Sequence, residues 1–279
     1  MMGKIWFVTG AGSGIGRGIV KAALKAGDRV VATGRNLDKV RKAFCGENRE
    51  NLAFVQLDVT DETQATAAVE QAVQRFGRID VLVNNAGYSL LGNFEELTIP
   101  DMERLFATNF WGVAYVMRAA LPAMRKQRSG RIINISSTAG VVGLKHCSAY
   151  SATKFAVEGL SLATATEVGQ FGIKITLVEP GFFLTDLLAA SNAKYADSTI
   201  ADYAAEGSAQ AMWSPYDGKQ TGSPDKLGNA LVALASMPNP PQVFVGGSDG
   251  LALVTPAIEA RLKDMRDHDA LSRSTDIAA

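Results

Sequence analysis

Short apolar runs alternate with longer amphipathic stretches over most of the chain. Runs rich in Val, Ile and Leu predict buried strands, whereas apolar residues spaced three and four positions apart predict helices. The predicted strands are residues 5–8, 29–33, 52–57, 79–83, 131–135, 173–178 and 242–246. The predicted helices are residues 15–27, a segment ending at 76, 101–128 with a bend at Pro122, 149–169 and 224–236. This alternation predicts an α/β fold with a doubly wound, parallel, seven-stranded sheet.

The regular pattern weakens in two places. Between residues 186 and 222, small, polar and aromatic residues mix without a clear period. A segment of this length after a strand predicts a flexible loop that covers a binding site. Residues 255–279 predict a further helix and a polar tail. No boundary or repeat divides the chain, so a single domain over residues 1–279 is expected.

The charge balance narrows the possible partners. The chain has 279 residues, with 28 basic and 28 acidic side chains and no basic run. This composition argues against nucleic acid and a charged membrane surface as partners. Cys45 and Cys147 belong to no cysteine or histidine cluster, so neither a disulfide framework nor a metal site is expected. The first apolar run is too short for a signal or membrane segment, which makes a cytoplasmic protein the expectation.

A glycine-rich turn, TGAGSGIG over residues 9–16, follows the first predicted strand and opens the first predicted helix. Glycines in such a turn allow a pyrophosphate to approach closely, and amides at the helix N-terminus then meet its charge. The alternative is a purely structural turn between strand and helix. Its place at the start of the chain, ahead of a second strand, favours nucleotide binding.

Two further positions bear on the nucleotide. The second strand leads into Gly34 and Arg35, where NAD-binding folds often place an acid that accepts hydrogen bonds from the ribose. Arg35 can instead pair with a 2′-phosphate, although an arginine just beyond a strand is often only a solvated loop residue. Asp58 follows the third strand, where it either contacts the adenine or caps the next helix. NADP(H) is therefore the favoured cofactor, and NAD(H) is the alternative.

Tyr150 and Lys154 lie four positions apart, which places them on one face of a predicted helix. An ammonium beside the phenol would stabilise its phenolate and make Tyr150 an acid or base near neutral pH. The same spacing also arises by chance, with a solvated lysine near a core tyrosine. Ser137 precedes Tyr150 by 13 residues, a step that allows a loop to bring the hydroxyl over this helix. Asn109 interrupts an apolar helix face, so it is either a structural linchpin or part of a site.

Taken together, these motifs resemble the short-chain dehydrogenase/reductase family over roughly residues 4–250. The resemblance rests on TGAGSGIG (9–16), NNAG (84–87), Asn109, ISS (135–137), YSATK (150–154) and PGFFLT (180–185), in the family's order and spacing. It implies a Rossmann-like sheet ordered 3-2-1-4-5-6-7 and hydride transfer between a nicotinamide and a carbonyl or alcohol. A looser likeness of residues 180–186 and 246–249 to hydroxysteroid and retinol dehydrogenases does not establish a substrate.

The resemblance also implies residue roles. Tyr150 would give or take the substrate proton, and Ser137 would hydrogen-bond the substrate oxygen. Lys154 would lower the pKa of Tyr150 and bind the nicotinamide ribose, while Asn109 would hold a water molecule that links Lys154 to solvent. Thr185 would bind the nicotinamide carboxamide. The other implied cofactor contacts are Gly10, Ser13, Gly14, Ile15, Gly16, Arg35, Asp58, Val59, Asn85, Ala86, Gly87, Pro180 and Gly181, with Tyr150 and Lys154 shared.

Two features refine these implications. Ser13 stands where NADP-dependent members often carry a basic residue, so the NADP(H) preference rests mainly on Arg35. The loops expected around the nicotinamide carry apolar residues and no obvious arginine, which predicts a hydrophobic ketone, aldehyde or secondary alcohol as substrate. These residues are Val141, Val142, Leu144, Phe182, Phe183, Leu187, Leu188, Met212 and Trp213. His146 and Cys147 lack a catalytic partner and are expected at the pocket rim or in the core.

Other functions stay open from the sequence. An NAD(P)-binding regulator or scaffold without turnover would keep the fold, but it would be expected to lose Tyr150 or Lys154, and both are present. An isomerase or dehydratase of related, longer families would need a substrate domain, for which no length is left. The helices at 101–128 and 149–169 are expected to pair in a homodimer or homotetramer.

Overall fold

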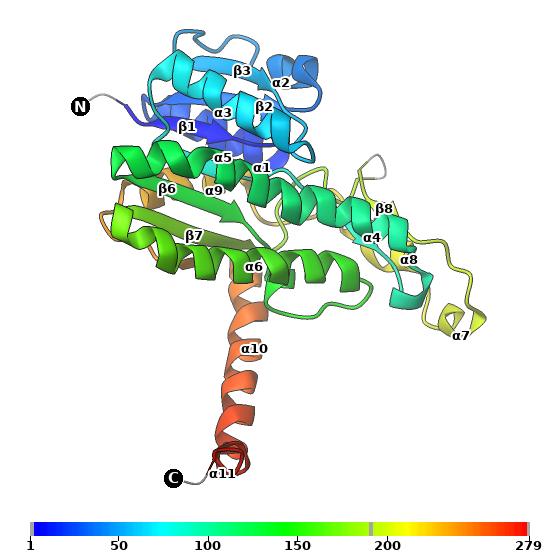
Figure 1. Cartoon of the computed structure of the whole chain (residues 1–279). Coiled ribbons are helices and arrows are strands. Elements are labelled where there is room, and N and C mark those ends of the chain that lie inside the picture. Colours follow the sequence, from blue (N-terminus) through cyan, green and yellow to red (C-terminus); the bar gives the residue numbers. More distant parts are fainter. Residues whose placement is uncertain (1–2, 190–191, 278–279) are drawn as a thin grey trace.

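A computed structural model describes residues 3–189 and 192–277. The ends of the expected domain and tail, residues 1–2 and 278–279, and positions 190–191 of the expected loop lie outside the described residues. A seven-stranded parallel sheet forms the centre of the molecule (Figure 1). Its strands are β1 (Ile5–Val8), β2 (Arg29–Gly34), β3 (Leu52–Gln56), β4 (Val81–Asn84), β6 (Gly130–Ile135), β7 (Ile173–Pro180) and β9 (Val243–Gly246). The order β3-β2-β1-β4-β6-β7-β9 confirms the predicted doubly wound sheet.

Helices cover both faces of this sheet (Figure 1). One face packs against α1 (Gly14–Lys25), α2 (Leu37–Ala43) and α9 (Pro224–Ser236), and the other against α3 (Glu62–Phe76), α5 (Gly112–Gln127) and α6 (Ser148–Val168). Side chains alternate between the faces: Trp6 and Val8 belong to the core under α1, whereas Phe7 belongs to the core under α3. Burial on both faces explains why the strands read as continuous apolar runs.

The order of the strands fixes the position of the binding crevice. The chain moves from β1 outward to β3 and then returns to β4 on the opposite side of β1. Such a reversal leaves a crevice at the carboxyl ends of the strands, where open α/β sheets bind ligands. The segments that follow β1, β4, β6 and β7 all line the same cavity.

The predicted helix over residues 101–128 is divided in the structure. It consists of α4 (Ile99–Phe106), a π-helical turn (Ala107–Trp111) and α5. Pro122 lies inside α5, so the break in helical geometry occurs at the π-turn rather than at the proline. Single π-turns inside helices often mark functional positions, and this one contains the buried Asn109.

The segment between β7 and α9 carries short elements that the sequence did not predict. It contains β8 (Lys194–Tyr195), α7 (Ala201–Ala204) and α8 (Ala209–Trp213). Strand β8 pairs with β5 (Leu90–Leu91) in a separate parallel ribbon. Hydrogen bonds from Thr199 N and Ile200 N to Glu96 Oε1 attach the segment further, at 2.8 and 3.0 Å. Residues of this segment, among them Leu188, Lys194 and Trp213, line the cavity at the carboxyl ends of the sheet strands, and the predicted flexibility of the segment stays a prediction.

The C-terminal helix begins earlier than the sequence predicted. Helix α10 covers Ser248–Asp267 instead of starting near residue 255, and α11 covers Asp269–Arg273. Helix α10 projects away from the sheet (Figure 1), and its first turn is held where Asp249 Oδ2 accepts a 2.6 Å hydrogen bond from Phe182 N. Within residues 3–189 and 192–277, no helix has the length and apolar character needed to cross a membrane.

Candidate active site

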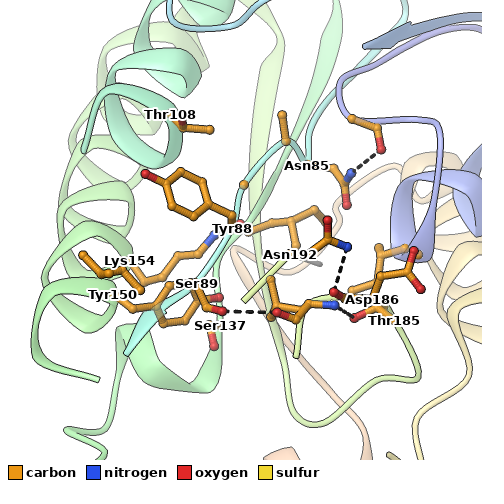
Figure 2. A pocket seen from close by; sticks show the side chains of 18 of the residues that line it. Asn85, Tyr88, Ser89, Thr108, Ser137, Tyr150, Lys154, Thr185, Asp186 and Asn192 are labelled. Carbon is orange, nitrogen blue, oxygen red and sulfur yellow. Dashed lines mark hydrogen bonds between the residues drawn. The ribbon is translucent and has the colours of Figure 1, made fainter. Parts of the chain in front are cut away.

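A cavity of about 1080 Å³ lies at the carboxyl ends of the sheet strands. It contains most of the site residues that the sequence predicted, drawn from segments far apart in the chain. These are Gly10, Ser13, Gly14, Ile15, Arg35, Asp58, Val59, Asn85, Ala86, Gly87, Ser137, Tyr150, Lys154, Pro180, Gly181 and Thr185. Figure 2 shows Tyr150, Lys154 and Ser137 grouped on one side, across from Thr185, Asp186 and Asn192 of the covering segment. Gly16 and Asn109 do not line the cavity.

The glycine turn forms one end of this cavity. Gly14 has a left-handed φ of 51°, and a Cβ at this position would lie 3.0 Å from Thr185 Cγ2. At Gly16 a Cβ would lie 2.4 Å from Gly10 O and 2.5 Å from Asn85 Nδ2, and its predicted cofactor contact stays a prediction. Gly16 therefore allows α1 to approach the sheet, and the other glycines leave the turn open to a ligand.

Hydrogen bonds made by Thr9 and Asn85 join the glycine turn to the end of β4. Thr9 Oγ1 accepts hydrogen bonds from Asn85 N at 2.9 Å and from Ala86 N at 3.0 Å. Asn85 Nδ2 donates to Thr9 O at 2.9 Å and to Gly10 O at 3.1 Å. The side-chain amide of Asn85 therefore holds the backbone of the glycine turn in a fixed position relative to the end of β4.

The end of the cavity beside β2 carries two cations. Arg35 lines it as predicted, and so does Lys39, which the sequence analysis missed. Both side chains are exposed and neither belongs to an ion pair formed within the described part of the chain. Asp58 lines the same end, but its Oδ1 accepts hydrogen bonds from Thr60 N and Thr60 Oγ1 at 3.0 and 2.8 Å. Asp61 rather than Asp58 caps α3.

Lys154 and Tyr150 meet at the centre of the cavity. Lys154 is 6% exposed, and its Nζ donates a 2.9 Å hydrogen bond to Ile135 O at the end of β6. The same Nζ lies 5.6 Å from the centre of the Tyr150 ring. Ser137 begins the turn after β6, and its Oγ accepts a 3.1 Å hydrogen bond from Ala139 N. The helix spacing and the strand end thus bring the three predicted side chains together.

Burial has the largest effect on the pKa values at this centre. Burial raises the pKa of Tyr150 to about 12, although the Ser137 hydroxyl opposes the rise. Burial also lowers the pKa of Lys154 to about 8, and the nearby Glu158 carboxylate opposes that fall. In this arrangement Lys154 does not lower the pKa of Tyr150, because desolvation of both groups outweighs their attraction, with the ammonium over the ring and bonded to Ile135 O. The role of Tyr150 as an acid or base near neutral pH stays a prediction.

Asn109 connects two segments of the site through hydrogen bonds of its side chain. Its Oδ1 accepts a 3.1 Å hydrogen bond from Tyr88 N, and its Nδ2 donates to Tyr88 O at 3.0 Å and Thr153 Oγ1 at 3.2 Å. The side chain thereby joins the segment after β4 to α6, the helix that carries Tyr150 and Lys154. A Cβ on the neighbouring Gly87 would lie 3.1 Å from Asn109 Oδ1 and 3.9 Å from Lys154 Nζ, so these groups are closely packed.

The other end of the cavity is mainly apolar. Six of the nine residues predicted there line it: Leu144, Phe182, Phe183, Leu187, Leu188 and Trp213. Val141, Val142 and Met212 do not, so that part of the prediction is wrong. The segment after β4 adds Tyr88, Leu90 and Leu91, which no sequence motif marked. Phe182 stacks on Trp213 and Tyr216 with ring centres 5.9 and 5.7 Å apart.

Several other groups bear on the chemistry of this cavity. Arg104 and Lys194 line it, contrary to the prediction of an apolar pocket without an arginine, but Arg104 is paired with Asp101. Burial raises the pKa of Cys147 to about 12, which makes its thiol a poor nucleophile. His146 is buried, and neither ring nitrogen finds a hydrogen-bond partner in the described structure. Among the described residues, no cluster of His, Cys, Asp and Glu is arranged to hold a metal ion.

Comparison with known proteins gives an independent view of this geometry. A family model described as short chain dehydrogenase matches residues 4–196. The chain is 37% identical to 3-ketodihydrosphingosine reductase from Bacteroides thetaiotaomicron, covering 86% of this chain and 87% of that protein. It is 40% identical to a 3-alpha-(or 20-beta)-hydroxysteroid dehydrogenase from Mycobacterium tuberculosis, covering 67% and 72%.

Solved structures agree with these matches. A short-chain dehydrogenase from Streptomyces avermitilis superposes with a TM-score of 0.89 at 35% identity, covering 99% of this chain and 100% of that one. ElxO with NADP bound superposes with a TM-score of 0.75 at 32% identity, covering 90% and 100%. The sheet, the cavity and the sequence matches therefore point to the same family.

Proposed function

Because this chain belongs to the short-chain dehydrogenase/reductase family and is an NAD(P)-dependent oxidoreductase acting on CH–OH or C=O groups, we propose that it uses NADP(H) and a hydrophobic substrate. One observation carries the proposal. The cluster of Ser137, Tyr150 and Lys154 lies in the same cavity as the glycine turn and the apolar residues around Phe182. Such a cavity has room for a nucleotide at one end and a reacting carbon near the tyrosine.

The residues present fit a dinucleotide. The turn at Gly10 and Gly14 has no side chain to block a phosphate, and the first amides of α1 lie beside it. Gly87, Pro180 and Thr185 would hold the nicotinamide end. When bound, the cofactor supplies or accepts the hydride, and the protein contributes the proton and the orientation.

The side chains at the centre of the cavity would transfer the proton to and from the substrate oxygen and hold that oxygen in place. Tyr150 donates its phenolic proton to a carbonyl during reduction, which its high pKa permits because the phenol stays protonated at neutral pH. In the reverse direction, Lys154 as an ammonium stabilises the phenolate that must form. Ser137 donates a hydrogen bond to the substrate oxygen and so fixes its position beside Tyr150. Asn109 keeps α6 in register with the end of β4.

The preference for NADP(H) rests on the end of the cavity beside β2. Gly34 puts no carboxylate at the end of β2, where it would repel a 2′-phosphate. Arg35 and Lys39 both line this end of the cavity, and neither has an acidic partner among the described residues. Arg35 can hold a phosphate with two hydrogen bonds, and Lys39 adds a second charge. The NADP bound in ElxO, a structural relative, supports this preference.

The substrate class follows from the opposite end. Leu144, Leu188 and the stacked Phe182 and Trp213 favour an apolar molecule, in keeping with the steroid and sphingoid names of two relatives. We expect a hydrophobic ketone, aldehyde or secondary alcohol. The test follows nicotinamide absorbance across apolar carbonyls, sugars and charged metabolites. Better kcat/KM for a charged sugar than for every apolar carbonyl would reject this class. Binding of NADPH without turnover of any compound would favour the regulatory alternative.

A cytoplasmic homodimer or homotetramer completes the proposal. Trp111, in the π-turn before α5, is 49% exposed, and Phe155 and Leu162, on α6, are 45% and 39% exposed. Apolar side chains gathered on neighbouring helices suit a symmetric interface between two copies. Light scattering after size-exclusion chromatography tests this arrangement, and a monomer at micromolar concentration would reject it.

A further inference from the structure

Helix α10 leaves the body of the molecule at the edge of the sheet. It follows β9, the last strand in the sheet order, and projects away from the other helices (Figure 1). The base of the helix is fixed, because Val254 is 2% exposed and Asp249 Oδ2 accepts a 2.6 Å hydrogen bond from Phe182 N. From residue 258 to residue 277 every side chain is exposed. The direction of α10 is therefore set, while most of its length packs against nothing in the described part of the chain.

Apolar side chains form one stripe along this projecting helix. Leu251, Ile258, Leu262 and Met265, the α10 stripe, are separated by seven, four and three residues, so they share one face of the helix. Their exposed fractions are 53, 54, 42 and 64%. Helices in proteins gain most of their stability from packing an apolar face. The α10 stripe is therefore a face that lacks the packing partner such a helix requires.

The charges of α10 distinguish between classes of partner. The polar side chains of residues 259–267 include three basic and three acidic groups, so this part of the helix has no net charge. A helix that lies on a lipid surface is rich in Lys and Arg on its polar face. Equal numbers of both charges instead suit a protein surface with the same mixture, such as a second copy of α10. The six side chains are Glu259, Arg261, Lys263, Asp264, Arg266 and Asp267.

The order of these charges favours an antiparallel second copy. Glu259 and Arg266 lie on one flank of the stripe, about two helical turns apart, and Arg261 lies on the other flank. None of the three belongs to an ion pair formed among residues 3–189 and 192–277. In an antiparallel pair, equivalent flanks meet, so Glu259 of each copy faces Arg266 of the other. In a parallel pair, opposite flanks meet, and Arg261 would lie beside Arg266 of the second copy, which is repulsive.

We propose that α10 pairs with α10 of a second copy of this chain, antiparallel across a two-fold axis, with the α10 stripe in the contact. A two-fold contact uses the same surface on both copies, which an apolar stripe with self-complementary charges satisfies. The inference goes beyond the proposed function, because it depends on neither the cofactor nor the substrate. It also uses a different element from the contact through α5 and α6, so each contact can be removed alone.

The first experiment measures the molar mass of the full chain by sedimentation velocity over a range of concentrations. Ile258→Asp places a carboxylate in the stripe and should halve the mass of the wild-type oligomer. The dissociation constant of the α10 contact should rise about 100-fold, about tenfold for each of the two symmetry-related side chains. Ile99→Asp is the matched control, because Ile99 is 62% exposed and lies on α4. Thermal melting confirms that each variant is folded.

Charge reversal tests the identity of the partner and its direction. Glu259→Arg and Arg266→Glu should each weaken the contact at low salt, by about tenfold, because like charges then face each other twice. The double variant, and an equal mixture of the two single variants, restore opposite charges and should recover the wild-type mass. A parallel pair would instead be strengthened by Arg266→Glu, since this change removes the repulsion from Arg261.

A halved mass in Ile258→Asp, recovery in the double charge variant and no change in Ile99→Asp would support the pairing. A monomeric wild type, an unchanged mass in Ile258→Asp, or a stronger contact in Arg266→Glu would overturn it. Binding of wild type to phosphatidylserine vesicles that Ile258→Asp abolishes without a change in mass would also overturn it, in favour of a lipid surface. Trp111→Glu keeps this test separate from the proposed contact through α5 and α6: an unchanged mass in that variant rejects the α5 and α6 face without deciding the pairing of α10.

Discussion

Replacement of Thr9 by valine tests how the site is held together. Thr9 is 1% exposed, and its hydroxyl accepts hydrogen bonds from the backbone amides of Asn85 and Ala86 at 2.9 and 3.0 Å. Valine keeps the shape of the side chain and removes the acceptor, so both amides lose their partner. Each buried amide without a partner costs about 1–3 kcal/mol. Because Asn85 and Ala86 are only half-buried, we expect Thr9→Val to lower the free energy of unfolding by about 2–3 kcal/mol.

The assay is urea unfolding at a fixed protein concentration, together with NADPH titration by fluorescence. Thr9→Ser is the control, because serine keeps the hydroxyl and should lose much less stability. NADPH affinity should fall in Thr9→Val, since Asn85 and Ala86 line the cavity. A stability loss below about 0.5 kcal/mol, the range of ordinary surface substitutions, would show that these hydrogen bonds do not hold the turn to β4.

Three further predictions concern charge. Arg35→Ala and Lys39→Ala should each lower kcat/KM for NADPH about 10-fold or more and leave kcat/KM for NADH unchanged. If the ratio of the two kcat/KM values is unaltered in both variants, these residues are only solvated surface residues. Glu179→Gln should be more stable than wild type above pH 7, by up to about 3 kcal/mol, and equally stable near pH 4. The reason is that wild-type stability falls as the pH rises from the usual glutamate pKa of 4.5 to the folded value of about 7. Melting temperatures of the two proteins that differ by the same amount at every pH in this range would contradict this prediction. Lys154→Ala should reduce both turnover and NADPH affinity, and loss of turnover alone would argue against ribose binding by Lys154.

The sequence was most informative where a motif coincides with the end of a strand. The positions of Gly10, Asn85, Ser137 and Thr185 in the cavity could be predicted because parallel strands all end at one edge of the sheet. The order of the strands followed from the family resemblance, and it was correct. Arg35 was found through the missing acid after β2.

The remaining features depend on contacts that no local pattern shows. Lys39 reaches the cavity from α2, and Leu91 does so through the pairing of β5 with β8, a contact between distant segments. The π-turn at Asn109 leaves no mark in the apolar periodicity on either side of it. The raised pKa of Tyr150 could not be predicted from its spacing to Lys154, because burial depends on the whole packed site.

The most direct test of the account is the effect of Tyr150→Phe on a substrate that the wild-type enzyme reduces. The variant removes the phenolic proton and leaves the glycine turn and Lys154 in place. We expect kcat to fall by about 10²–10⁴-fold, the usual contribution of an acid or base, with NADPH affinity nearly unchanged. Retention of more than about a tenth of the wild-type kcat, well above this range, would contradict the assignment of Tyr150 as the proton donor.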